Sequence, residues 1–122
     1  MKDRVILMTG VYDTLDIFTY ELKKEFEKIG LEVMIFDTQD MEGSMIKLGK
    51  FIQQPVKAVV TFNNLGFNME IIKGQNIWEQ LQIPCINILM DHPFIHKKAL
   101  DEAPSNAVVI CPDFYYLSIH IL

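Results

Sequence analysis

The sequence predicts an α/β fold: a three-layer Rossmann-like sandwich with a mostly parallel, five-stranded sheet. Short apolar runs, typical of buried parallel strands, alternate five times with segments that suit helices. The chain has 122 residues, about the length of one domain, and 50% of them are hydrophobic. Charged residues make up 22%, which is typical of a globular protein. We therefore expect residues 1–122 to form a single Rossmann-like domain.

The first half of the chain predicts the order strand, helix, strand, helix. Residues 5–9 and 31–37 are short apolar runs. Between them, apolar side chains recur every three or four residues and Gly30 follows, which indicates an amphipathic helix from Asp13 or Thr14. A second helix with the same spacing must end before Pro55. The expected inner faces are Leu15, Phe18, Leu22, Phe26 and Ile29 in the first helix, and Met41, Met45, Leu48 and Ile52 in the second.

The second half continues the alternation. Residues 56–62 are rich in β-branched and aromatic side chains and predict a third strand, which a polar loop at 63–68 follows. A third helix is expected over residues 69–81, although Gly74 weakens it by about 1 kcal/mol relative to alanine. The further elements expected are a strand from Pro84, a helix from Pro93, a strand over 107–111 and a last, almost wholly apolar helix from Asp113.

Charge and cysteine usage exclude several classes of protein. The net charge is −5 and no basic run occurs, so we expect no nucleic-acid partner. Cys85 and Cys111 lie in apolar runs without C-x-x-C spacing, which predicts buried free thiols in a reducing compartment. No apolar run approaches the ~20 residues of a membrane span. A cytoplasmic location without a membrane span is the expectation.

Polar residues follow three of the predicted strands. In open α/β sheets, ligands gather at the carboxyl ends of strands where the winding direction reverses, so we expect loops 10–13, 63–68 and 91–93 to flank one crevice. Asn and Asp also satisfy loop backbone groups and cap helices, and that structural interpretation stays open. The candidate ligand-binding residues are Gly10, Tyr12, Asp13, Asn63 and Asn64, and the candidate catalytic residues are Asp91 and His92.

Nucleotide-binding signatures are weak in this sequence. A dinucleotide fingerprint needs three glycines after the first strand, and Gly10 is the only one there. Without those glycines, a ribose contact from Asp37 at the end of the second strand is disfavoured. A flavodoxin-like phosphate loop would use hydroxyl groups such as those of Thr9 and Thr14, although Thr14 is better explained as a helix cap.

A metal site is not expected. His92 and His96 are four residues apart, with Asp91 beside them, and on a helix such a pair shares one face. If Pro93 begins the helix, however, His92 lies outside its regular part, which favours a solvated or capping role.

Three stretches together resemble a known family. They read Thr-Phe-Asn-Asn-Leu-Gly-Phe at 61–67, Leu-Gln-Ile-Pro-Cys-Ile-Asn at 81–87 and Leu-Met-Asp-His-Pro-Phe at 89–94. They resemble the amino-terminal domain of bacterial glycosyltransferase-like proteins related to the spore maturation protein CgeB. In that family, the third strand ends in Phe-Asn, and the next strand begins after Ile-Pro and ends in Asp-x-Pro or Asp-His-Pro. The resemblance extends from Val5 to about Asp113.

The resemblance implies a GT-B glycosyltransferase, in which two Rossmann-like domains enclose the active site. The amino-terminal domain of such an enzyme mainly serves the acceptor, a small molecule or glycan, and the carboxyl-terminal domain holds the nucleotide-sugar donor. Residues 1–122 would then be the acceptor-side domain of a longer two-domain protein, with no cofactor of its own and inactive or nearly so alone. Asp91 or His92 would be the base that deprotonates the acceptor hydroxyl. A chain that ends at Leu122 departs from this family pattern.

Two alternative hypotheses remain. The first is a non-catalytic module that binds a small ligand or a mononucleotide at the same crevice, as flavodoxin-like domains do. The second is an interaction unit that self-associates through the apolar residues 114–122, because large uncovered apolar surfaces usually mark a missing partner.

Overall fold

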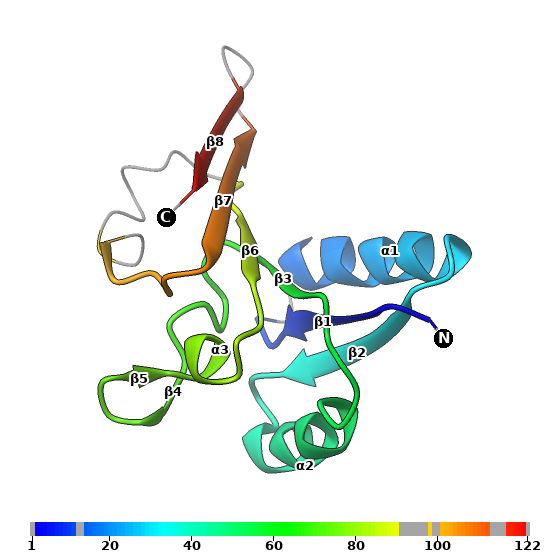
Figure 1. The fold of residues 1–122 in the computed structure, drawn as a ribbon. Coiled ribbons are helices and arrows are strands. Elements are labelled where there is room, and N and C mark those ends of the chain that lie inside the picture. Colours follow the sequence, from blue (N-terminus) through cyan, green and yellow to red (C-terminus); the bar gives the residue numbers. More distant parts are fainter. Residues whose placement is uncertain (1, 12–13, 91–97, 99–100, 113–116, 122) are drawn as a thin grey trace. The chain divides into compact units, whose positions relative to one another are not determined.

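A computed structural model describes residues 2–11, 14–90, 98, 101–112 and 117–121. Its main sheet has the strand order β2-β1-β3-β6-β7-β8, in which the first five strands are parallel and β8 is antiparallel. Helices flank the sheet (Figure 1), which confirms the predicted Rossmann-like α/β sandwich. The five parallel strands follow the order of flavodoxin-like folds. The chain divides into two compact units, Met1–Val59 and Val60–Leu122.

The first unit has the strand and helix order that the sequence predicts. It contains β1 (Arg4–Thr9), α1 (Thr14–Lys28), β2 (Glu32–Asp37) and α2 (Met41–Phe51), and it includes the start of β3 (Ala58–Phe62). β1 and β2 pair in parallel from Arg4 opposite Glu32 to Thr9 opposite Asp37. The two helices lie on opposite sides of these strands (Figure 1). β2 is at one edge of the sheet.

Helix α1 buries only part of the face that its apolar spacing predicts, since Leu15, Leu22 and Phe26 are half-buried. Its buried residues are Asp16 and Thr19, whereas the side chains of Phe18 and Ile29 are 39% and 75% exposed. The reason is that backbone groups of the neighbouring strand and loop need polar partners. Thr19 donates a hydrogen bond from Oγ1 to the carbonyl of Met8 (3.1 Å), and Asp16 accepts from the loop after β1. Two polar residues that satisfy buried backbone groups therefore share the inner side of α1 with half-buried apolar residues.

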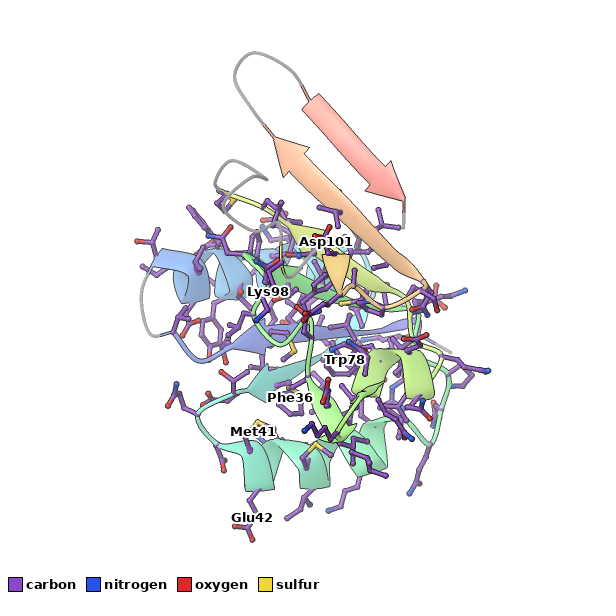
Figure 2. All side chains as sticks on the ribbon, turned by 90° about the vertical axis from the view of Figure 1, so that its left-hand side faces the viewer. Phe36, Met41, Glu42, Trp78, Lys98 and Asp101 are labelled. Carbon is purple, nitrogen blue, oxygen red and sulfur yellow. The ribbon has the colours of Figure 1, made fainter. Side chains whose placement is uncertain are left out.

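Helix α2 begins after Asp40, whose side chain accepts a hydrogen bond from the Gly43 amide (3.1 Å) and so caps the helix. It buries Ser44, Leu48 and Phe51. Figure 2 shows Phe36 between β2 and α2, and Glu42 pointing away from the sheet. Of the expected inner face, Leu48 is confirmed, whereas Met41 is 43% exposed.

The second unit has two sheets. β6 (Cys85–Ile88) and β7 (Ala107–Pro112) pair in parallel in the main sheet, and β4 (Glu70–Ile72) and β5 (Gln75–Asn76) form a separate antiparallel hairpin. A single-turn helix, α3 (Ile77–Gln80), follows the hairpin, and β8 (Leu117–Ile121) pairs with β7. The strands expected at 56–62, from Pro84 and at 107–111 are thus present as β3, β6 and β7.

The prediction of a helix over residues 69–81 is wrong. Residues 70–76 form the β4–β5 hairpin, and only Ile77–Gln80 is helical. Gly74 has a φ of +84°, a backbone conformation that L side chains rarely adopt, so it favours the turn of the hairpin over a helix interior. The Asn76 side chain then accepts hydrogen bonds from the amides of Trp78 (2.9 Å) and Glu79 (3.2 Å), which starts α3.

The prediction of a last helix from Asp113 is also wrong for the part of that segment that the structure describes. Residues 117–121 form the antiparallel strand β8, in register with β7 from Leu117 opposite Pro112 to Ile121 opposite Val108. Residues 117–121 alternate apolar and polar types, Leu-Ser-Ile-His-Ile, which is the period-two pattern of a strand. The helix expected from Pro93 lies mostly outside the described residues, although Lys98 and Asp101 (labelled in Figure 2) are helical.

The core contains Cys85, which is fully buried and free, as the sequence predicts. Burial raises the pKa of its thiol from 9.0 to about 12, because the thiolate would lose its hydration. The side chain of Cys111 lies outside the described part. No helix in the part of the chain that the structure describes is long and apolar enough to cross a membrane.

Candidate functional site

The polar loop after β3 makes a sharp turn through two consecutive asparagines. Asn63 and Asn64 have φ values of +48° and +65°, the left-handed region that Asn tolerates better than most other non-glycine residues. The Asn63 amide donates to the carbonyl of Ile88 (3.0 Å), which links the end of β3 to the end of β6. The predicted site residues Asn63 and Asn64 therefore lie at the carboxyl ends of these two strands.

A pair of side-chain amides fixes the turn. Asn87, fully buried on β6, donates from Nδ2 to Oδ1 of Asn64 (2.6 Å) and accepts at Oδ1 from the Asn64 backbone amide (3.1 Å). Asn87 was not among the predicted site residues. A signal for it exists in the sequence, because a lone amide inside the apolar run of β6 needs a polar partner when it is buried.

Asn63 holds the chain just after β6. Its Oδ1 accepts a hydrogen bond from the backbone amide of Met90 (2.7 Å), and the Leu89 amide donates to the carbonyl of Ile110 on β7 (2.8 Å). Met90 immediately precedes Asp91 in the sequence. The predicted catalytic residues Asp91 and His92 lie outside the described residues. The structure thus brings Asn63, Asn64, Asn87 and Met90 together and fixes the segment that leads to the predicted catalytic pair.

The same loop is also held from its far end. Trp78 is fully buried and donates from Nε1 to the carbonyl of Gly66 (2.7 Å), while Nδ2 of Asn76 donates to the carbonyl of Phe67 (2.9 Å). The hydroxyl of Thr61 donates to the Leu65 carbonyl (2.5 Å). Hydrogen bonds from β3, β5 and α3 therefore support residues 63–68, so a ligand at this loop would meet preorganised backbone and amide groups.

The loop after β1, in the first unit, forms hydrogen bonds with the side chain of Asp16 in α1. The Asp16 carboxylate is buried and accepts hydrogen bonds from the amides of Gly10 (3.2 and 3.3 Å) and Val11 (3.4 Å). Gly10 has a φ of +137°, and a Cβ atom there would overlap Oγ1 of Thr38. Of the residues predicted in this loop, Gly10 has a structural role, and Tyr12 and Asp13 lie outside the described residues.

The internal carboxylate limits what the first loop binds. In phosphate-binding α/β proteins, backbone amides after the first strand point at the anion. Here the amides of Gly10 and Val11 already bind Asp16, whose negative charge also opposes a second anion. Asp37, the other nucleotide candidate, accepts at Oδ1 from the Gln39 amide (2.9 Å) and closes the turn after β2. Both carboxylates thus have structural roles in this unit.

The amide cluster of the second unit has a different chemistry. The hydrogen bonds between Asn63 and Met90 and between Asn64 and Asn87 use amide and backbone groups, which donate and accept without carrying charge. Among the described residues, no three His, Cys, Asp or Glu side chains converge to hold a metal ion. The cluster is thus built from neutral polar groups that form hydrogen bonds with one another and with Met90.

Comparisons of the chain with models of protein families, with curated proteins and with solved structures gave no match. The residues of the loops therefore carry the functional argument.

Proposed function

We propose that this chain is the acceptor-side domain of a GT-B glycosyltransferase and binds the hydroxyl-bearing molecule that receives the sugar. The observation that carries the proposal is the hydrogen bond from the Met90 amide to Oδ1 of Asn63. It joins the ends of two neighbouring strands directly before Asp91 and His92, in the segment that resembles the CgeB-related family. A base that removes a proton from an acceptor must be held in place, and this bond holds the chain that leads to it.

In the proposed reaction, Asp91 or His92 takes the proton of the acceptor hydroxyl as that oxygen attacks the anomeric carbon of the donor sugar. The bond between the sugar and the nucleotide diphosphate breaks, and the nucleotide diphosphate leaves with the bonding electron pair. The nucleotide sugar itself would be bound by a carboxyl-terminal domain, as the resemblance implies. The neutral amides of Asn63 and Asn64 fit an acceptor hydroxyl at this loop.

The loop after β1 supports an acceptor role over a nucleotide role. Asp16 accepts hydrogen bonds from the amides of Gly10 and Val11, the groups that would otherwise bind a phosphate. Replacing this internal carboxylate by a bound phosphate would leave Asp16 buried without those donors, which is costly. A donor nucleotide is therefore better placed in another domain.

A second candidate is a non-catalytic module that binds a mononucleotide. One observation favours it, namely the strand order β2-β1-β3-β6-β7, because flavodoxin-like folds have this order and bind a flavin mononucleotide at their switch point. In this hypothesis, the ligand would displace Asp16 from the amides of Gly10 and Val11.

An NMR titration of the 122-residue chain separates the two candidates. Flavin mononucleotide and uridine diphosphate glucose are the nucleotide probes, and N-acetylglucosamine and glucose are the acceptor probes. The acceptor proposal predicts shifts at the backbone amides of Asn63, Asn64 and Met90 with at least one sugar, and none at Gly10 with either nucleotide. Saturable shifts at Gly10 and Val11 with a nucleotide, and none with sugars, would establish the module instead.

Turnover tests the catalytic pair. In the protein that joins this chain to its donor-binding domain, we expect Asp91→Asn or His92→Ala to lower the rate of sugar transfer by about 10²- to 10⁴-fold. Asp3→Asn is the matched control, because Asp3 is exposed and accepts the hydrogen bond from the Glu32 amide through its backbone carbonyl. Unchanged turnover in both variants would rule out the assigned roles.

A further inference from the structure

The first unit contains a pocket of about 450 Å³ on the α2 side of β2. Its charged and aromatic lining comes from Arg4, Glu32, Lys47, Lys50 and Phe51, and β2 contributes residues 33–35. Arg4 and Glu32 are the first residues of β1 and β2, so the pocket lies at the amino-terminal ends of these strands. The predicted site loops follow the carboxyl ends of strands. None of the residues that line this pocket belongs to the proposed acceptor site, and its volume is in the range of small-molecule sites.

Arg4 contacts Glu32 and Phe51 in this pocket but is incompletely paired. Its side chain is 12% exposed, its guanidinium carbon lies 4.0 Å from the centre of the Phe51 ring, and Nη2 donates to Oε1 of Glu32 (3.1 Å). A guanidinium has five N–H donors, and among the described residues Glu32 is its only acceptor. The Nε atom is buried without an acceptor there. Buried donors without acceptors are costly, so this guanidinium is suited to a further anionic partner.

Lys47 and Lys50 add positive charge that the described part of the chain does not neutralise. Both are exposed, and neither has an ion-pair partner among the described residues. Their spacing of three residues places them on the same side of α2. A lysine in the last turn of a helix interacts favourably with the helix dipole. This interaction partly explains the presence of Lys50, but it explains neither Lys47 nor the largely buried Arg4.

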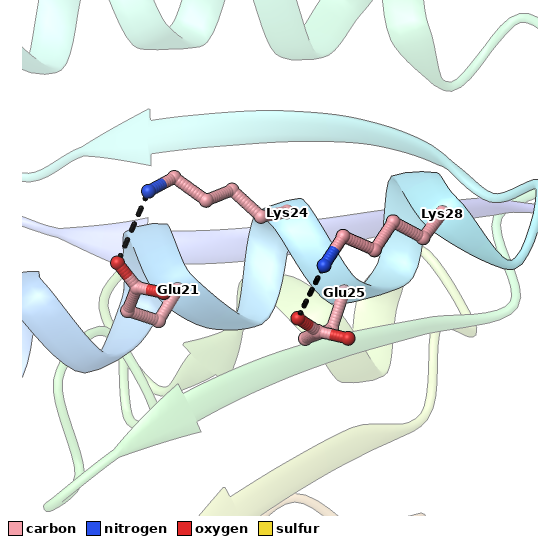
Figure 3. A network of polar contacts seen from close by, with 4 residues as sticks. All are labelled: Glu21, Lys24, Glu25 and Lys28. Atoms are coloured by element: carbon pink, nitrogen blue, oxygen red, sulfur yellow. Dashed lines mark hydrogen bonds and ion pairs between the residues drawn. The ribbon is translucent and has the colours of Figure 1, made fainter.

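Helix α1 provides the contrast. Its lysines Lys23, Lys24 and Lys28 are each paired with a glutamate three or four residues away, at 2.8–3.1 Å. Figure 3 shows two of these pairs, Lys24 with Glu21 and Lys28 with Glu25. Helix α2 has no acidic residue three or four positions from Lys47 or Lys50. Of the two long helices, only α2 thus carries lysines that have no ion-pair partner among the described residues.

The charge of the pocket is opposite in sign to the net charge of the protein. Three cationic side chains face one carboxylate, so the pocket carries a local excess of two positive charges in a chain whose net charge is −5. Positive charge with low-dielectric walls attracts anions selectively, because the rest of the surface repels them. The planar guanidinium fork beside two ammonium groups matches the several oxygen atoms of a phosphoryl group.

We propose that this pocket binds a small organic phosphate. The phosphoryl oxygens accept hydrogen bonds from Arg4 and the ammonium groups of Lys47 and Lys50, while Glu32 and Phe51 keep the guanidinium in position. The organic part of the ligand lies along residues 33–35 of the edge strand β2. The site is a binding site, and no bond of the ligand is made or broken there.

An NMR titration of the full chain with phenyl phosphate at constant ionic strength tests this proposal. We expect saturable shifts at the amides of residues 33–35 and 47–51. Arg4→Gln, and separately the double change Lys47→Gln with Lys50→Gln, should each weaken binding at least tenfold. Because Arg4 is largely buried, the exposed lysine pair keeps the test independent of folding. The matched control is Lys24→Gln with Lys28→Gln on α1, which removes the same charge and should leave the dissociation constant unchanged.

Three results would overturn the proposal. The first is the absence of saturable shifts at the pocket, and the second is an equal loss of affinity in the α1 control, which would indicate non-specific attraction. The third is equal or tighter binding of benzoate, which has the same ring with a carboxylate, because the site would then not select a phosphoryl group. Binding of sugars at Asn63 and Asn64 is measured at other resonances, so the two proposals succeed or fail separately.

Discussion

Asn87 and Asn64 bind each other through two hydrogen bonds, from Nδ2 of Asn87 to Oδ1 of Asn64 and from the Asn64 backbone amide to Oδ1 of Asn87. The first joins two side chains at 2.6 Å, and Asn87 is fully buried. Asn64 adopts a positive φ, so its conformation is unfavourable without support. The buried amide of β6 therefore stabilises the turn that leads into the proposed acceptor loop.

Asn87→Asp should destabilise the protein by about 2–3 kcal/mol at pH 7, because a carboxylate cannot donate to Oδ1 of Asn64 and places negative charge against it. Urea unfolding followed by circular dichroism measures this. Relative to wild type, the deficit should shrink as the pH falls toward 4, where the new carboxyl group regains a proton to donate. Gln54→Glu makes the same chemical change at an exposed position and should have an effect below about 0.5 kcal/mol. An equal loss of stability in both variants would contradict the role of Asn87.

Gly10→Ala should cost about 2–4 kcal/mol, because the new methyl group overlaps Oγ1 of Thr38 and the φ of +137° disfavours L residues. Gly49→Ala serves as the control within α2. No atom lies within 4 Å of a Cβ built there, so alanine should stabilise the helix by about 0.5–1 kcal/mol. Thermal unfolding of the two variants should shift in opposite directions. A neutral Gly10→Ala change would mean that this loop tolerates a different conformation.

Gly74→Ala distinguishes a hairpin from a helix at residues 70–76. At a φ of +84°, alanine should destabilise the turn by about 1 kcal/mol, and this effect comes from the backbone alone because no atom lies within 4 Å of the new methyl group. In the interior of a helix, the same substitution would instead stabilise by about 1 kcal/mol. The sign of the change in the free energy of unfolding is the readout, and a gain in stability would argue for the helix.

Because the thiol of Cys85 is buried, we expect the folded protein to lose stability at alkaline pH. Burial raises the pKa of its thiol from 9.0 to about 12, so the folded protein keeps the proton while the unfolded chain releases it above pH 9. The contribution of Cys85 is therefore fully present below pH 9 and decreases by up to about 1.4 kcal/mol per pH unit between pH 9 and 12. Comparing wild type with Cys85→Ala from pH 7 to 11 isolates this thiol from other titrating groups. A difference that stays constant with pH would show that the thiol titrates normally in the folded state.

The sequence predicted the parallel strands well, because each is a short apolar run with a turn residue or proline at its end. β1, β2, β3, β6 and β7 all begin within two residues of their predicted starts. The loop residues Asn63 and Asn64 were identified as site candidates for the same reason, since polar groups after a buried strand lie at the edge of the sheet.

Other features depend on partners that are distant in the sequence. The spacing of α1 indicates a helix but not that its fully buried residues are Asp16 and Thr19, which form hydrogen bonds with the loop after β1 and with the carbonyl of Met8. A helix was predicted for residues 69–81, whereas the structure has a hairpin there. The positive φ of Gly74 favours the hairpin turn. The sequence marks Asn87 only as a lone amide in an apolar run, and its role follows from its hydrogen bond to Asn64, 23 residues away.

The intrinsic fluorescence of Trp78 reports on the surroundings of its indole ring. Trp78 is the only tryptophan of the chain, it is fully shielded from water, and its ring nitrogen is bonded to Gly66 in the proposed acceptor loop. Its fluorescence emission should therefore be blue-shifted in the folded protein and move to longer wavelength when this loop loosens. Recording this emission while a saccharide is added would therefore follow the state of residues 63–68 without any label or change of sequence.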